Sequence, residues 1–172
     1  MKRPVLFCVI SCLALAEDTQ AATITGTVKN KDGNPVANVT IKASNGNSAT
    51  TVPSPPGTYT LTVPDNWSGY IVASYKPGPA YWPNSPAYRT ISNVSGNLTG
   101  QDFTMLAPSQ PAPETLSGTV TVSGGSGLQN VLVYAGANGG GDITASDGKF
   151  NIGVSPSGPP LVWSGTVTPV KE

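Results

Sequence analysis

Aromatic side chains are concentrated in residues 67–88, where they are interleaved with prolines. Exposed Trp and Tyr rings are surfaces on which sugar rings stack, so we take Tyr81, Trp82 and Tyr88 as a candidate glycan-binding platform. The competing interpretation is that these three rings close one end of a folded domain, because large aromatic side chains usually contribute to packing. Both interpretations stay open on the sequence.

The sequence offers few groups for catalysis, because it contains no histidine and both of its cysteines lie near the N-terminus. This excludes Ser-His-Asp and Cys-His chemistry and removes the ligands that most zinc sites need. Asp32, Asp65 and Asp147 each lie beside Gly or Asn at a predicted reversal, where an Asp side chain caps its own turn. Asp142 and Asp147 bracket a turn that could hold calcium, but no DxDxDG-like loop exists. We predict no enzyme activity, no cofactor and no metal site.

The N-terminus has the features of a secretory signal peptide. Two basic residues precede an apolar run at residues 4–16, and small residues allow cleavage after Ala16 or Ala21. We assign residues 1–21 to this signal; a lipoprotein attached through Cys12 is the alternative. Cleavage would remove both cysteines, so the mature chain is expected to have no disulfide and no transmembrane segment. We therefore predict a secreted, extracellular or cell-surface protein.

Charge argues against nucleic acid as a partner. Lys and Arg together number nine and so do Asp and Glu, and charged residues make up only 10% of the chain, without a basic patch. Nucleic acids and anionic membranes are therefore poor partners. A surface of Thr, Ser, Asn and Gly is typical of extracellular β-rich modules.

Alternation of apolar and polar residues with a period of two predicts β-strands along the chain. The clearest examples are residues 58–63 and 149–154, in which large apolar residues alternate with polar or small ones. Turn residues such as Asp-Gly and Pro-Pro-Gly separate these short segments, and no segment has a helical period. We predict an all-β fold made of antiparallel Greek-key β-sandwich modules of the prealbumin or immunoglobulin type.

The chain contains an internal repeat. Residues 24–28 (ITGTV) return as residues 116–120 (LSGTV), and each copy continues to a Trp-Ser-Gly. We assign residues 22–106 to a first module, residues 107–114 to a Pro-rich linker and residues 115–172 to a second copy. The linker is expected to hold the modules apart as an extended spacer.

The second copy ends soon after Trp163 and lacks the later strands of the first. We therefore interpret the chain as a fragment or a truncated gene product. A shortened copy would expose an unpaired strand edge, so we also expect self-association through residues 115–168.

The order of turn and strand motifs resembles the carboxypeptidase regulatory-like domain, a prealbumin-like β-sandwich found as tandem modules in secreted bacterial proteins. The motifs are G-x-V at 26–28, DGNPV at 32–36, NVTI at 38–41, GTYTL at 57–61 and QDF at 101–103. The resemblance covers the first module completely and the second up to Trp163. It implies a non-catalytic module that lends stability, spacing or binding to a larger extracellular protein, within a fold group that includes starch-binding-like domains.

The sequence leads to two hypotheses about function. The first is a structural spacer, surface-display unit or accessory domain, with a polysaccharide or a cell-surface protein as the partner. The alternative is a carbohydrate-binding module that uses the aromatic platform around Trp82.

Overall fold

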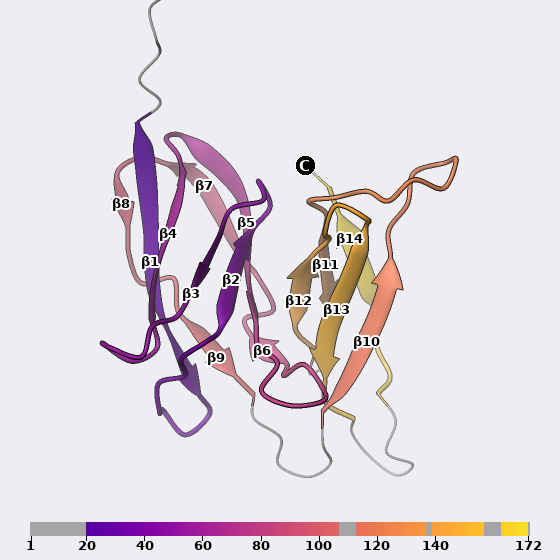
Figure 1. Cartoon of the computed structure of the whole chain (residues 1–172), viewed down its shortest axis with the longest axis horizontal. Coiled ribbons are helices and arrows are strands. Elements are labelled where there is room, and N and C mark those ends of the chain that lie inside the picture. The colour runs from indigo at the N-terminus through magenta and orange to yellow at the C-terminus, as the bar shows by residue number, and fades with distance from the viewer. Residues whose placement is uncertain (1–19, 107–112, 137–138, 157–162, 172) are drawn as a thin grey trace, which may run out of the picture.

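The computed structural model describes residues 20–106, 113–136, 139–156 and 163–171. These residues form strands, turns and loops and no helix (Figure 1). The expected all-β class is confirmed, with mainly antiparallel pairing in four sheets; the Greek-key connection stays a prediction. Nothing in this described part of the chain is a helix of the length and apolarity needed to cross a bilayer.

The first module consists of two sheets packed face to face. One sheet has the order β4-β1-β9-β6, with β8 paired to β1, and the other has the order β3-β2-β5-β7. The strands are β1 (Ala21–Asn30), β2 (Thr40–Ala43), β3 (Ser48–Thr50), β4 (Thr58–Pro64), β5 (Trp67–Ser74), β6 (Asn84–Ser85), β7 (Arg89–Val94), β8 (Asn97–Leu98) and β9 (Phe103–Met105).

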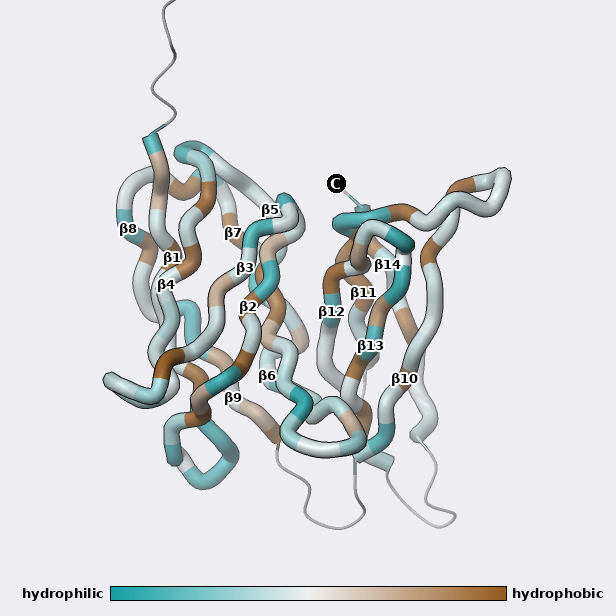
Figure 2. Tube along the Cα trace, viewed as in Figure 1, coloured by the Kyte–Doolittle hydropathy of each residue, from teal (hydrophilic) through white to brown (hydrophobic). Residues whose placement is uncertain are grey.

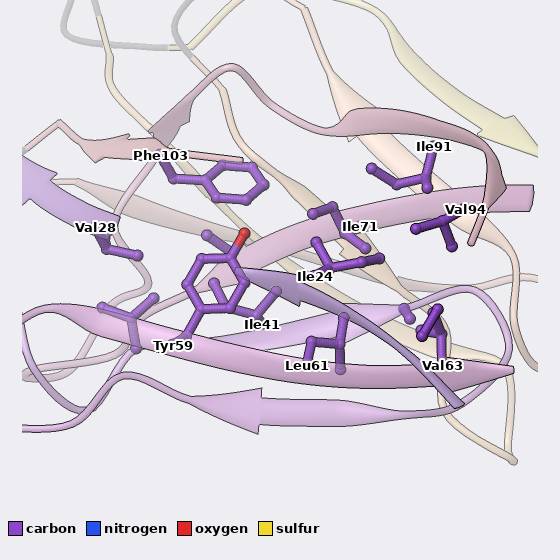
Figure 3. Packing of buried hydrophobic residues seen from close by; sticks show 14 of the residues in the cluster. Ile24, Val28, Ile41, Tyr59, Leu61, Val63, Ile71, Ile91, Val94 and Phe103 are labelled. Atoms are coloured by element: carbon purple, nitrogen blue, oxygen red, sulfur yellow. The ribbon is translucent and has the colours of Figure 1, made fainter. Parts of the chain in front are cut away.

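The core of the first module lies between these sheets (Figure 3). On β4 the apolar residues Tyr59, Leu61 and Val63 are buried, whereas the two Thr residues between them are exposed, as the period of two predicts. Phe103 enters the same core from β9. Figure 2 shows hydrophobic residues recurring along the strands of both modules.

The second module repeats the first five strands. They are β10 (Glu114–Thr119), β11 (Leu132–Ala135), β12 (Gly141–Ile143), β13 (Lys149–Val154) and β14 (Val167–Val170). Strand β10 pairs with β13 as β1 pairs with β4, and β11 lies between β12 and β14 as β2 lies between β3 and β5. The registers also agree, because Leu116 is opposite Ile152 where Ile24 is opposite Leu61.

Residues that recur in both copies have the same backbone conformation or the same packing. Asn38 and Asn130 both adopt a left-handed backbone, with φ of 62° and 60°. Gly118 lies directly under the ring of Phe150, as Gly26 lies under the ring of Tyr59, and neither site has room for a Cβ atom. These residues are therefore explained by turns and ring packing, as the repeat suggests.

The two modules pack against each other. Lys42 of β2 forms an ion pair with Asp142 of β12, and Val72 of β5 is buried in one cluster with Leu132 of β11. Figure 1 shows the β2 and β5 sheet facing the β11 and β12 sheet. The expectation that the linker holds the modules apart is therefore wrong: apolar side chains on the outer faces of both sheets are buried by contact between the modules.

Tyr59 provides a test of the first core through pH. Its hydroxyl donates a hydrogen bond to the carbonyl oxygen of Gln101. Burial raises the pKa of this phenol above its usual range, against a smaller lowering by Arg89. A raised folded pKa stabilises the fold below the unfolded value of about 10, and this stabilisation is lost as pH rises further.

We expect Tyr59→Phe to flatten the alkaline loss of stability, because it removes the group whose ionisation the core opposes. The urea midpoint of the wild type should decrease as the pH rises above about 10, and that of the variant should decrease less. At neutral pH the variant should be less stable by about 1 kcal/mol, because one hydrogen bond is lost. Tyr75→Phe serves as the control, and equal alkaline sensitivity of all three proteins would argue against this role of Tyr59.

Candidate functional site

The contact between the modules is the most elaborate arrangement of side chains outside the two cores. Val72, Leu132 and Ile143 are buried there, and Tyr70, Tyr88, Tyr134 and Val170 pack around them; we call these seven residues the intermodule cluster. Val72 lies on the outer face of β5, between two neighbours that belong to the first core, and it is fully buried. An outward-facing valine on a half-solvated sheet would be exposed, so the second module completes its environment.

A part-buried ion pair adjoins the intermodule cluster. The Lys42 ammonium donates to Oδ1 of Asp142 at 2.6 Å, and the side chains are 35% and 3% exposed respectively. Oδ1 also accepts the N–H of Ile143 at 2.9 Å, and Oδ2 accepts the N–H of Asn151 at 2.8 Å. Because both oxygens of the carboxylate are satisfied, its burial is compensated and it fixes β2 against β12.

Glycines allow the backbones of the two modules to approach closely. A Cβ atom added at Gly141 would lie 2.6 Å from the carbonyl oxygen of Ala87, and one added at Gly140 or Gly153 would overlap Asn84 or the backbone at Trp82. Gly140, Gly141 and Gly153 are therefore explained by docking, whereas a Cβ atom at Gly139 would meet Ala135 of its own module. A side chain at Gly140, Gly141 or Gly153 would require the modules to move apart.

The three predicted platform residues make different contacts in the structure. Tyr88 belongs to the intermodule cluster and contacts Tyr134 across the modules, with ring centroids 4.9 Å apart. Trp82 packs against the first core and meets Tyr75 edge to face at 5.3 Å. All three predicted rings are half-buried, and none of the ring contacts joins one of them to another.

Tyr81 also reaches the second module. Its backbone N–H donates to Oγ1 of Thr115 at 3.1 Å, and the ammonium of Lys76 lies 5.4 Å from the centre of its ring. The segment that carries Tyr81, Trp82 and Tyr88 thus contributes to docking as well as to the first core. A glycan-binding role for these residues stays a prediction.

Sequence reasoning missed the docking of the modules, although a signal was present. Residues 71–73 and 131–133 are uninterrupted apolar runs, which interrupt the period of two. A strand that is apolar on consecutive positions is typical of a sheet covered on both faces. Together with Gly140 and Gly141, these runs indicate that each sheet is buried by something beyond its own module.

A groove of about 360 Å³ opens where the modules meet. Polar and apolar groups both line it: Lys42, Asn47 and Ser48 come from the first module and Asn130, Ile143 and Ser146 from the second, among other residues. None of the described residues that line it is aromatic. The groove therefore offers hydrogen-bonding groups but no surface for stacking a sugar ring.

The carboxylates that sequence reasoning assigned to turns are engaged locally. Asp147 accepts the N–H of Lys149 at 3.1 Å and pairs with its ammonium at 2.7 Å. These hydrogen bonds lower the pKa of the Asp147 carboxyl below its ordinary value. Asp32 pairs with Lys31, its neighbour in sequence. Over the ranges that the structure describes, no three His, Cys, Asp or Glu side chains gather as metal ligands would.

Comparison with known proteins adds no relative: no family model, no curated protein and no solved structure matches this chain.

Proposed function

We propose that this chain is a secreted, non-catalytic β-sandwich repeat protein whose two modules form one rigid spacer, display or accessory unit of a larger extracellular assembly. The proposal rests on what the side chains that could bind a ligand or a metal contact in the structure. Tyr88 and Asp142 are occupied in joining the modules, and Trp82 packs on the first core. A reactive or ligand-binding set would instead leave its functional groups converging on a cavity.

The contact between the two modules would hold them in one rigid arrangement. Two β-sandwiches on a Pro-rich tether would sample many orientations, and their end-to-end distance would vary. The part-buried ion pair and the intermodule cluster restrict that freedom, because separating the modules would expose Val72 and Leu132 and leave Asp142 without Lys42. Such a unit holds what is attached to it at a fixed distance and orientation.

The alternative function, glycan binding around Trp82, leads to an opposite result in a simple experiment. Affinity electrophoresis of the wild type in gels containing starch, xylan, cellulose or chitin should show no retardation. Trp82→Ala should leave mobility unchanged but lower the free energy of unfolding by about 2 kcal/mol, because it removes a ring packed on the first core.

Trp82→Phe is the matched control, since it keeps an aromatic ring against Tyr75. It should be closer to the wild type in stability than Trp82→Ala. Retardation of the wild type on one glycan, abolished in Trp82→Ala at unchanged stability, would refute the spacer proposal and support the carbohydrate-binding alternative.

A further inference from the structure

The first and last strands of the first module lie side by side and run in the same direction. Residues 28–30 of β1 are level with residues 103–105 of β9, and residues 23–24 of β1 are level with residues 97–98 of β8; both pairings are parallel. Strand β1 begins at one end of the sheet, at the top of Figure 1, and β9 ends at the other, at the bottom. The chain therefore enters and leaves this module at opposite ends of neighbouring strands.

The parallel pairing determines how the module responds when its two ends are pulled apart. Tension between Gln20 and Leu106 draws β1 toward its first residue and β9 toward its last residue. Because the two strands are parallel, these pulls act in opposite directions along one axis, and the strands can separate only by sliding past each other. Sliding stretches the hydrogen bonds between the strands together, whereas peeling a strand from one end breaks its bonds one after another.

Hydrogen bonds join β1 to the chain around β8 and β9 along most of its length. Near its start, the N–H of Thr23 donates to the carbonyl oxygen of Gly96 at 2.8 Å. Near its middle, the N–H of Thr27 donates to Oδ1 of Asp102 at 2.7 Å, and the hydroxyl of Thr27 donates to the same oxygen at 3.0 Å. Pairing of residues 28–30 with β9 continues this series. Sliding would therefore have to break several bonds at the same time.

The two residues that lead into β9 are anchored to three further strands. The N–H of Gln101 donates to the carbonyl oxygen of Thr25 on β1 at 3.1 Å, and the carbonyl oxygen of Gln101 accepts the hydroxyl of Tyr59 on β4. The carbonyl oxygen of Asp102 accepts Nε of Arg89 on β7 at 2.8 Å. Strand β7 belongs to the other sheet, so this segment is fixed to both sheets of the module.

The core side chains of β1 and β9 also oppose sliding. Phe103 and Met105 are 2% and 0% exposed, and Ile24 and Val28 on β1 are fully buried in the same core. A shift by one residue would turn the apolar side chains of the moving strand away from the core. Movement of β9 along β1 therefore exposes apolar surface as well as breaking hydrogen bonds.

We propose that the first module bears mechanical tension and stays folded when the structures attached at its two ends are pulled apart. The inference rests on the proposed spacer role and deepens it, because a spacer between two extracellular structures transmits the force that acts between them. Docking of the second module does not supply this resistance. Lys42 and Val72, which contact the second module, lie in the sheet that does not contain β1 and β9.

The test is single-molecule force spectroscopy of the complete chain in two pulling directions. Attachment through Gln20→Cys and Leu106→Cys loads β1 and β9 in shear, whereas attachment through Gln20→Cys and Pro64→Cys peels β1 from β4, since residue 64 is paired with the start of β1. Cys8 and Cys12 would be replaced by Ser where the N-terminus is retained. We expect a several-fold higher unfolding force in the shear direction. Equal forces in the two directions would overturn the proposal.

Asp102→Ala provides a second readout in the shear direction. It removes the acceptor of the Thr27 N–H and should raise the unfolding rate at constant force about fivefold. Asp32→Ala is the matched control and should leave that rate unchanged, because Asp32 pairs with Lys31 in the turn after β1. An unchanged rate in Asp102→Ala, or an equal rise in Asp32→Ala, would also overturn the proposal. Neither result would refute the spacer role, which is tested separately by the distance between the two modules.

Discussion

Valine in place of Gly141 is expected to separate the two modules without unfolding them. The added Cβ atom would lie 2.6 Å from the carbonyl oxygen of Ala87 and 3.3 Å from Cγ1 of Val72. The first of these is a backbone atom and cannot rotate away, so the contact must open. Overpacking of this kind costs about 1–3 kcal/mol, which is a large fraction of what holds two small modules together. Small-angle scattering should show a larger radius of gyration for the variant.

The control for this substitution is Gly78→Val. Gly78 has no heavy atom within 4 Å of the Cβ position and lies outside the strands, so valine should leave the scattering curve unchanged. Circular dichroism of Gly141→Val should still show folded β-structure. A variant as compact and as stable as the wild type would mean that the close approach of Gly141 to Ala87 is not a feature of the molecule in solution.

Loss of the Asp142 carboxylate should lower the free energy of unfolding by more than Gly141→Val does. Asp142→Ala leaves the Lys42 ammonium without its partner and leaves two backbone N–H groups, those of Ile143 and Asn151, without an acceptor. Removing one member of a buried ion pair costs about 3–5 kcal/mol. We expect a decrease near the lower end, about 3 kcal/mol, because Lys42 is one-third exposed and can recover some hydration.

Lys42→Met and the double variant complete this experiment. Lys42→Met should cost less than Asp142→Ala, because the carboxylate keeps both of its backbone donors. Urea unfolding of the two single variants and of Lys42→Met/Asp142→Ala gives the coupling energy. Coupling of about 1 kcal/mol or more is expected for a part-buried pair, and strictly additive losses would show that the two side chains do not interact.

Much of the fold could be predicted from the sequence, because local rules determine it. The alternation in residues 58–63 predicts a half-buried strand, and β4 has that pattern of burial. The ITGTV and LSGTV segments predict two equivalent units, and their strands have the same register in both copies. Turn and core positions depend on neighbours close in sequence, so a single chain suffices to recognise them.

The contact between the modules could not be predicted in the same way, because it depends on residues that are 34 to 100 positions apart in the sequence. The sequence places Asp142 on one side of a possible calcium turn, whereas its carboxylate pairs with Lys42. The sequence also groups Tyr88 with the candidate platform residues, whereas its ring packs on Tyr134. A ring that stacks on a sugar and a ring that covers another module have the same sequence signature, and only the partner surface distinguishes them.

The most direct test of the account is a distance measurement across the groove between the modules. Nitroxide labels at Ser48→Cys and Ser146→Cys lie on its opposite walls; Cys8 and Cys12 would be replaced by Ser where the N-terminus is retained. Pulsed electron resonance should give one short, narrow distance distribution in the wild-type background and a longer, broader one with Gly141→Val. A broad distribution already in the wild-type background would contradict the rigid two-module unit on which the proposed function depends.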